Sequence, residues 1–342
     1  MFTKIILYAT HTMVIAGIWR MGKLKSYLVF QHHEQGLEDF RQFLEHHRNT
    51  KIYLIADAVE EDFRLETLPH VVGKARHEMV DRKLNQLYRG THYRAAHFIN
   101  REKEKRKDDR YLFTALNNAD FLQPWIDHIA EQQAPLAGIY LLPMISQAMI
   151  RRLKLMAPNI LLSERLNSGL RQTYLHNGRL RMSRLAPIPE ATKNQLGYFY
   201  LVETEKTKLY LISQRYITRD TTLSMVLPAL DESSEQICRG IEQEHGLECN
   251  TIDLRAFAKS QHLDPKLLET NPELMHMHLL AHGAMPDNLA PANLTKHFQI
   301  VFLRQWINVT SAAVVVGGLL LTAVYFKSGF DQSLLIDQAA TA

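Results

Sequence analysis

The segment at residues 305–326 constrains this chain most, because it contains no charged residue. Its central part, VTSAAVVVGGLLLTAV at residues 309–324, is strongly apolar. A helix of ~20 such residues crosses the ~30 Å hydrocarbon core of a bilayer. The alternative is a buried helix of a soluble domain, but the many β-branched valines and the tandem Gly317 and Gly318 are poor formers of such a helix. We therefore predict one transmembrane helix at residues 305–326.

The residues that flank this segment support the same prediction. Arg304 and Lys327 bracket it, and Trp306 and Tyr325 stand where interfacial aromatic residues are expected. Positive charge is slightly richer before the segment, which favours a cytoplasmic N-terminal domain and a short periplasmic tail at residues 327–342.

Gly317 and Gly318 would allow two membrane helices to approach closely. No GxxxG spacing accompanies them. A homodimer through this pair is therefore only one option.

The remaining composition indicates a reduced, globular domain. The first residues, MFTKIILYATHTMVIAGIW, are interrupted by His11 and Thr12 and precede no cleavage site, so we predict strands rather than a signal peptide. Cys238 and Cys249 fit neither a zinc pair nor a CxxC motif, and we predict two reduced thiols. A net charge of +4 is too small for a nucleic-acid-binding protein.

The first half of the chain shows a run of three strands and then alternating elements. We predict strands at 4–10, 13–20, 24–31, 51–57 and 137–143, and helices at 36–48, 121–132 and 146–156, the last one capped by Ser146.

An insertion at about 68–119 adds a helix at 71–88 and a hairpin to this half. The charged turn of the hairpin, residues 101–110, suits either a solvated loop or a docking surface.

The second half repeats this order. We predict strands at 160–166, 170–176, 179–185, 223–228 and 247–254, and helices at 190–214, 233–244 and 272–282. The second and third strands flank Asn177-Gly178, a strong hairpin signal. Both halves therefore follow β-β-β-α-β-α-β-α, which indicates an α/β protein with mixed sheets covered by helices. We predict a duplicated, actin-like (RNase H-like) two-lobe domain, with lobe I at 1–156, lobe II at 157–285 and a linker at 286–304.

Several segments resemble the actin-like cytoplasmic proteins of type IV pilus and type II secretion assembly platforms, the PilM and GspL families with their MSHA-type relatives. They are LPHVVGKARHEMVDRKL, ADFLQPWIDHIAEQQAPLAGIYLLP, LRQTYLHNGRLRMSRL and PELMHMHLLAHGAM, within about residues 1–285. The resemblance implies an inner-membrane scaffold whose partners are cytoplasmic and membrane proteins of such a machine, its assembly ATPase among the candidates.

Nucleotide-binding members of that superfamily carry an acidic residue in a phosphate loop on the first hairpin of each lobe. Here the first hairpin, LYATHTMVIAGIW, has no Asp or Glu, and the second, ILLSERLNSGLRQTYL, has only Glu164. A glycine-rich adenosine loop is expected after residue 227, where the chain reads VLPALDESSEQ. We therefore predict no cofactor and no catalysis. A divergent ATPase or kinase that uses Glu164 remains an alternative.

The chain has 17 histidines, and HMHLLAH places His276, His278 and His282 together. His278 and His282 are four residues apart, as on one helix face, but no HExxH glutamate accompanies them. A metal-responsive membrane sensor is the third functional alternative, although we expect ordinary helix positions and no metal.

The linker before the membrane contains Asn288-Leu289-Ala290-Pro291. It resembles the Asn-Leu-Leu-Pro peptide of a membrane partner that binds the actin-like protein in pilus platforms. We therefore consider Asn288, Leu289 and Pro291 as a docking motif, in cis or on a neighbouring subunit, with a plain linker as the alternative.

Overall fold

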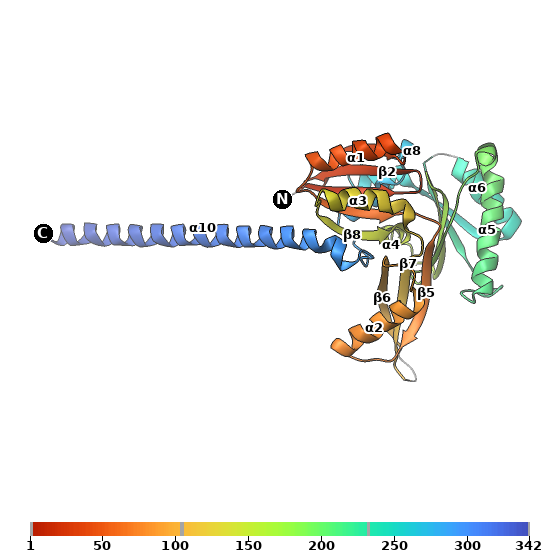
Figure 1. Ribbon diagram of the computed structural model, residues 1–342, viewed down its shortest axis with the longest axis horizontal. Helices are drawn as coiled ribbons and strands as arrows, with labels where there is room; N and C mark the ends of the chain where they lie inside the picture. Colours follow the sequence, from red (N-terminus) through yellow and green to blue (C-terminus); the bar gives the residue numbers. More distant parts are fainter. Residues whose placement is uncertain (1–2, 103–105, 231–232, 341–342) are drawn as a thin grey trace. The chain divides into compact units, whose positions relative to one another are not determined.

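The computed structural model describes residues 3–102, 106–230 and 233–340. The chain divides into two compact units, Met1–Thr295 and Lys296–Ala342. The first unit contains two five-stranded sheets and one three-stranded sheet (Figure 1).

The first sheet has the strand order β3-β2-β1-β4-β8. β1 pairs antiparallel with β2 and parallel with β4, which in turn pairs parallel with β8. Met21 and Gly22 have φ angles of 52° and 79°, as a tight hairpin turn between β2 and β3 requires. The strands are β1 (Thr3–Ala9), β2 (Met13–Arg20), β3 (Lys23–Gln31), β4 (Lys51–Ala56) and β8 (Leu136–Leu141).

The second sheet repeats this topology with the order β11-β10-β9-β12-β13. Asn177 and Gly178 again have positive φ angles, 50° and 67°, in the turn between the antiparallel strands. The predicted two-lobe α/β fold with duplicated mixed sheets is thus confirmed. The strands are β9 (Asn159–Leu166), β10 (Gly169–His176), β11 (Arg179–Ala186), β12 (Ser224–Ala229) and β13 (Glu248–Asp253).

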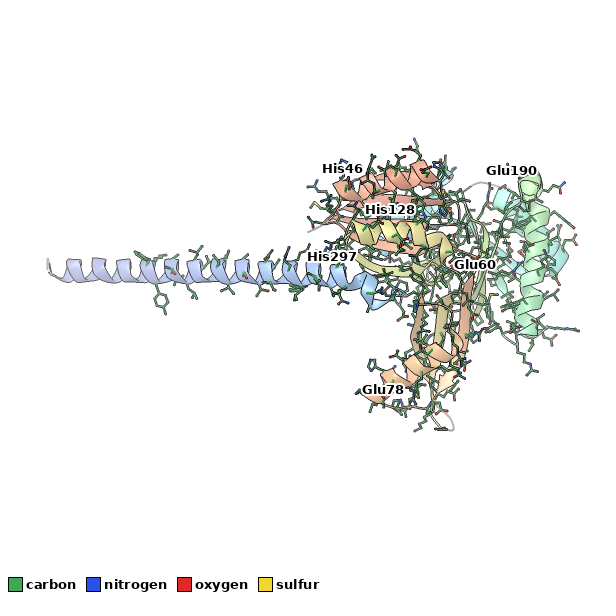
Figure 2. All side chains as sticks on the ribbon, in the orientation of Figure 1. His46, Glu60, Glu78, His128, Glu190 and His297 are labelled. Carbon is green, nitrogen blue, oxygen red and sulfur yellow. A yellow bond between two sulfur atoms is a disulfide. The ribbon has the colours of Figure 1, made fainter. Side chains whose placement is uncertain are left out.

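Helices cover both sheets. α1 (Glu34–His46) and α3 (Gln123–Glu131) pack together, with the rings of Phe40 and Trp125 edge to face at 5.1 Å; His46 and His128 mark these two helices in Figure 2. One apolar core contains residues of β1, α4 (Leu142–Arg152) and α9 (Leu274–Ala281) and joins the two lobes. α5 (Leu196–Ser213) and α6 (Ser233–His245) pack on the second sheet.

The insertion forms the third sheet, in the order β5-β7-β6, covered by α2 (Lys74–Leu87) (Figure 1). The predicted hairpin is present as β6 (Arg94–Arg101) and β7 (Asp109–Leu116). β5 (Glu61–Leu68) was not predicted, because its charged residues mask the alternation of its apolar ones. Of the predicted charged turn, residues 103–105 lie outside the described part of the chain.

The structure differs from the prediction in three further respects. α4 begins at Leu142, so Ser146 lies inside the helix and does not cap it; Pro143 in the first turn favours this earlier start. α7 (Leu254–Ser260) and α8 (Leu267–Thr270) were not predicted. Cys238 and Cys249 are joined by a disulfide and are not free thiols, because the packing of α6 on β13 brings their Cα atoms to 5.3 Å.

The second unit consists of most of α10 (Ala292–Ala340), a single helix of 49 residues. By length and composition its part from Ala292 to Lys327 can span a membrane, and its apolar window is not buried against the protein. Thr310 and Thr322 donate hydrogen bonds to the carbonyls of Trp306 and Gly318 at 2.9 Å, which satisfies their hydroxyls within the helix. Gly317, Tyr325, Arg304 and Lys327 also lie on this helix.

Candidate functional site

Strand β8 forms one edge of the first sheet, and residues 288–290 lie along it. The amide of Ile139 donates to Oδ1 of Asn288 at 2.9 Å, and the amide of Leu289 donates to the carbonyl of Ile139 at 2.9 Å. Nδ2 of Asn288 donates to the carbonyl of Ala137 at 3.3 Å. One backbone hydrogen bond and two that involve the Asn288 side chain therefore hold the segment along this edge.

Apolar burial and close packing fix the same segment. The side chain of Leu289 is 1% exposed and belongs to the core beneath the first sheet and the insertion. A Cβ at Gly138 would lie 2.8 Å from the side chain of Asn288, so only glycine leaves room for it. Asp287 pairs with His97 of β6 at 2.6 Å. The predicted docking residues Asn288 and Leu289 thus contact their own chain.

Pro291 ends this docked segment and starts the next element. The amide of Leu294 donates to the carbonyl of Pro291 at 3.1 Å, in the first turn of α10. Proline suits a helix start because it needs no amide partner there.

A buried charged cluster joins the two lobes around Asp57, which directly follows β4. Its carboxylate accepts hydrogen bonds from the hydroxyls of Tyr8 and Ser168 and pairs with the guanidinium of Arg171 on β10. Arg171 also pairs with Glu61, at 2.7 Å. The side chains of Asp57 and Arg171 are fully buried. The cluster therefore fastens the first strands of lobe I to the first hairpin of lobe II.

Burial governs protonation in this cluster. Burial raises the pKa of Glu61 to about 7, although the charge of Arg171 opposes the shift. Burial and the neighbouring Asp57 raise the pKa of the Tyr8 phenol well above its usual value. Two carboxyl groups thus share one guanidinium, and protonation of Glu61 brings their net charge to zero.

A second buried group lies around Glu164 of β9. Oε1 of Glu164 contacts Nε2 of His276 at 2.9 Å, and Oε2 accepts a hydrogen bond from Ser146 at 2.7 Å. Burial lowers the pKa of His276, but the charge of Glu164 outweighs it and the net shift is upward. Nearby, Glu273 accepts hydrogen bonds from the amide and side chain of Asn167, and burial raises the pKa of Glu273 to about 7.

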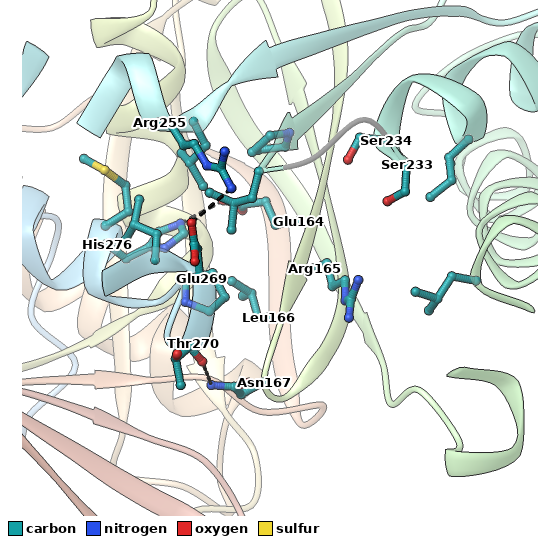
Figure 3. A pocket seen from close by; sticks show the side chains of 18 of the residues that line it. Glu164, Arg165, Leu166, Asn167, Ser233, Ser234, Arg255, Glu269, Thr270 and His276 are labelled. Carbon is teal, nitrogen blue, oxygen red and sulfur yellow. Dashed lines mark hydrogen bonds and ion pairs between the residues drawn. The ribbon is translucent and has the colours of Figure 1, made fainter. Parts of the chain in front are cut away.

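A pocket of about 260 Å³ lies in lobe II beside this group (Figure 3). The β9–β10 turn, α5 and the start of α6 line it, so it lies where the sequence analysis expected an adenosine loop. Two contacts fix its rim: Arg255 pairs with Glu269 at 3.0 Å, and Nδ2 of Asn167 donates to the carbonyl of Thr270 at 3.3 Å. The pocket is therefore framed by interactions within the protein itself.

Of the three candidate metal-binding histidines, His278 and His282 stack with ring centroids 4.1 Å apart, whereas His276 has a different partner. His276 faces Glu164, whereas Nδ1 of His278 accepts from the indole of Trp19 at 3.3 Å. Nε2 of His278 then donates to the carbonyl of Gln261 at 2.7 Å, and burial together with His282 lowers the pKa of His278 to about 4. Within residues 3–102, 106–230 and 233–340, no group of three or more His, Cys, Asp or Glu side chains is placed to hold a metal ion.

Sequence reasoning missed the lobe-joining cluster. The position of Asp57 directly after the apolar strand KIYLIA was a usable signal. An acid so close to the core is either turned out to solvent or buried with a partner. Arg171 carried no such signal, since it opens a run of three polar residues, Arg171 to Thr173, that suggests solvent exposure, whereas both faces of β10 are buried.

Comparison with known proteins identifies the fold. No family model matches the chain, and no curated protein matches its sequence. Among solved structures, a PilM–PilN type IV pilus biogenesis complex is similar, with 12% identity, a TM-score of 0.58, and coverage of 83% of this chain and 99% of that one.

Two further structures are related more distantly. The cytoplasmic domain of EpsL, an inner-membrane component of the Vibrio cholerae type II secretion system, has 9% identity and a TM-score of 0.44, covering 86% and 99% of the two chains. A Bacteroides thetaiotaomicron protein with an actin-like ATPase fold has 9% identity and a TM-score of 0.43, covering 81% and 95%. The predicted two-lobe fold and its resemblance to a PilM-type pilus component are confirmed.

Proposed function

We propose that this protein is a non-catalytic, membrane-anchored scaffold of an inner-membrane assembly platform of the type IV pilus or type II secretion kind. The actin-like fold and the apolar part of α10 support the proposal. The globular unit would lie in the cytoplasm and recruit cytoplasmic and membrane partners. The PilM structure was solved in complex with PilN, and a membrane partner of that kind is the one we expect here.

The lobe-joining cluster is the observation that carries the non-catalytic part of the proposal. An actin-like ATPase needs carboxylates in its two first hairpins to orient Mg²⁺ and water. Here Ser168, in the second of these turns, donates its hydroxyl to Asp57 instead, and Arg171 is held by Asp57 and Glu61. The carboxylates of Asp57 and Glu61 are thus engaged by Arg171 and are buried, so neither is presented to a metal–phosphate complex.

Nucleotide titration tests this part. The full chain in detergent should show no binding of ATP–Mg²⁺ at micromolar concentrations by isothermal titration calorimetry. A triple variant is titrated beside the wild-type chain; it combines Arg171→Met, Asp57→Asn and Glu61→Gln and removes all three charges. Its affinity for ATP–Mg²⁺ shows whether the charged cluster itself excludes the nucleotide. Micromolar binding to the wild-type chain would contradict the proposal.

The docked segment supports the scaffold part of the proposal. Asn288 and Leu289 occupy the β8 edge, whose amide and carbonyl at Ile139 another extended peptide could bind instead. A partner segment would therefore bind β8 only when residues 288–290 leave it. Crosslinking from native membranes should recover more of the membrane partner with Leu289→Ala than with the wild-type chain, and equal recovery would count against this edge.

The Cys238–Cys249 disulfide opposes a cytoplasmic location, because cytosolic thiols are usually kept reduced. Labelling of intact and of permeabilised cells with a membrane-impermeant thiol reagent shows on which side of the membrane the globular unit lies. Reduced cysteines that react only after permeabilisation agree with the cytoplasmic orientation.

A divergent ATPase or kinase is the second candidate function, and the pocket beside Glu164 is the observation that favours it. His276 and Ser146 would then hold this carboxylate in place of a loop aspartate. Glu164→Gln should abolish turnover in that case. An absence of phosphate release by the wild-type protein ends this candidate.

A further inference from the structure

A second cavity, of about 550 Å³, lies between the insertion and lobe II, away from both sites described above. Four arginines line it: Arg110 on β7, Arg179 and Arg181 on β11, and Arg215 just after α5. Leu65, Ile99, Asn100 and the Tyr174–Asn177 part of lobe II complete the wall, together with Tyr216. Among the residues that the structure describes, no Asp or Glu lines this cavity, which we call the arginine pocket.

Arg181 is the most constrained of the four arginines. Its side chain belongs to a residue only 8% exposed, and its Nη1 is buried without a hydrogen-bond partner. A buried guanidinium normally pairs with an acid, because burial of a lone charge costs several kcal/mol. Among the described residues, no carboxylate forms an ion pair with Arg181.

The other arginines do not supply the missing partner. Arg179 donates a hydrogen bond to the carbonyl of Ile99, and neither Arg110 nor Arg215 pairs with a carboxylate of the described chain. Burial raises the pKa of the neighbouring Tyr216, and the charge of Asp62 contributes to this shift. Asp62 itself is paired with Arg64 at 2.8 Å and does not line the pocket. Burial, and then the charges of Arg110 and Arg179, lower the pKa of Arg181. Like charges therefore face one another without a counter-charge.

We propose that the arginine pocket binds a small molecule that carries two or more phosphate groups. Guanidinium groups grip phosphate oxygens through paired hydrogen bonds, and a compact polyphosphate brings several negative charges to the four arginines at once. A single carboxylate would leave most of them without a counter-charge. The volume suits a small molecule rather than a nucleic acid or a membrane surface.

The position of the pocket gives binding a structural consequence. The ligand would contact β7 of the insertion and β11 of lobe II at the same time, and β5 and β11 already pack against each other. A bound polyphosphate would therefore fasten the insertion to lobe II. This consequence is independent of the scaffold function, since it requires neither a partner nor a membrane.

Calorimetric titration of the full chain in detergent with inorganic pyrophosphate tests the proposal. Arg110→Gln and Arg215→Gln should each weaken binding roughly tenfold or more, because each removes a charge-assisted contact. Arg219→Gln is the matched control: this exposed arginine lies four residues beyond Arg215 and outside the pocket, and its loss should change the affinity less than twofold. Raised salt should weaken binding of the wild-type chain.

Arg181→Gln adds a readout that does not depend on the exposed arginines. It should abolish pyrophosphate binding while the ligand-free chain keeps or gains melting temperature, because a buried unpaired charge is removed. Three results would overturn the proposal: no binding of pyrophosphate at millimolar concentration and low salt, binding that the three pocket substitutions Arg110→Gln, Arg181→Gln and Arg215→Gln all leave unchanged, or binding of a hexaglutamate peptide but not of pyrophosphate.

Discussion

Replacement of Asn288 by alanine should release the docked segment from β8 without unfolding the globular unit. The substitution leaves the amide of Ile139 and the carbonyl of Ala137 without their partners. It also removes the hydrogen bond that the amide of Ala290 donates to Oδ1 of Asn288. Each unmade hydrogen bond costs about 1–3 kcal/mol when water does not replace it. Since the edge admits some water, we expect a total at the lower end of that range.

Hydrogen exchange measures this release at the amides concerned. A loss of about 1–3 kcal/mol speeds exchange of the Ile139 and Leu289 amides roughly 5- to 150-fold. Amides in the centre of the sheet, such as that of Leu54 on β4, should stay unchanged. Asn293→Ala is the matched control, since this exposed asparagine lies on the same stretch of chain.

The reasoning fails if exchange at Ile139 is the same in Asn288→Ala and in the wild-type chain. Gly138→Ala provides an independent check from the opposite side of the contact. Its Cβ would meet the Asn288 side chain at 2.8 Å and should release the same two amides.

The remaining predictions concern acidity, the disulfide and the membrane helix. The pKa of Glu61 is about 7 in the folded chain and 4.5 in the unfolded chain. Between pH 4.5 and pH 7 the folded state therefore binds more protons than the unfolded state. Stability should therefore fall by up to about 3 kcal/mol as pH rises from 4.5 through 7, and Glu61→Gln should flatten denaturant-midpoint curves over that range. Reduction of Cys238–Cys249 should cost about 2–3 kcal/mol in the same assay, and Cys238→Ser should remove the response to reductant. Val315→Asp should add about 3 kcal/mol to membrane insertion and shift the protein out of carbonate-washed membranes.

The sequence predicted the layout of the fold well because both sheets consist of apolar runs with clear turns. Asn177-Gly178 and Met21-Gly22 mark hairpins by local backbone chemistry, and the structure has turns at both places. β5 was not predicted because four of its eight residues are charged, which hides the weak alternation of its apolar residues. Ser146 misled the assignment of α4, since a serine early in an apolar stretch resembles a cap although its hydroxyl serves Glu164 here.

The functional contacts were less predictable, because they join residues far apart in the chain. Asn288 was noticed as a motif, but nothing local shows that Ile139, 149 residues earlier, is its partner. Arg171 and Asp57 meet only after both lobes have formed. Such pairings depend on the tertiary arrangement, and the spacing of residues along the sequence does not predict it.

The docked segment has a mechanical consequence. Any tension between α10 and the globular unit passes along the chain through Pro291, and it reaches Leu289 and Asn288 before any strand of the two large sheets. Detachment of residues 288–290 would free about 10 Å of extended chain while those sheets stay intact. The segment thus lets the connection between α10 and the globular unit lengthen under load. The load has to break only a few hydrogen bonds and the buried contact of Leu289.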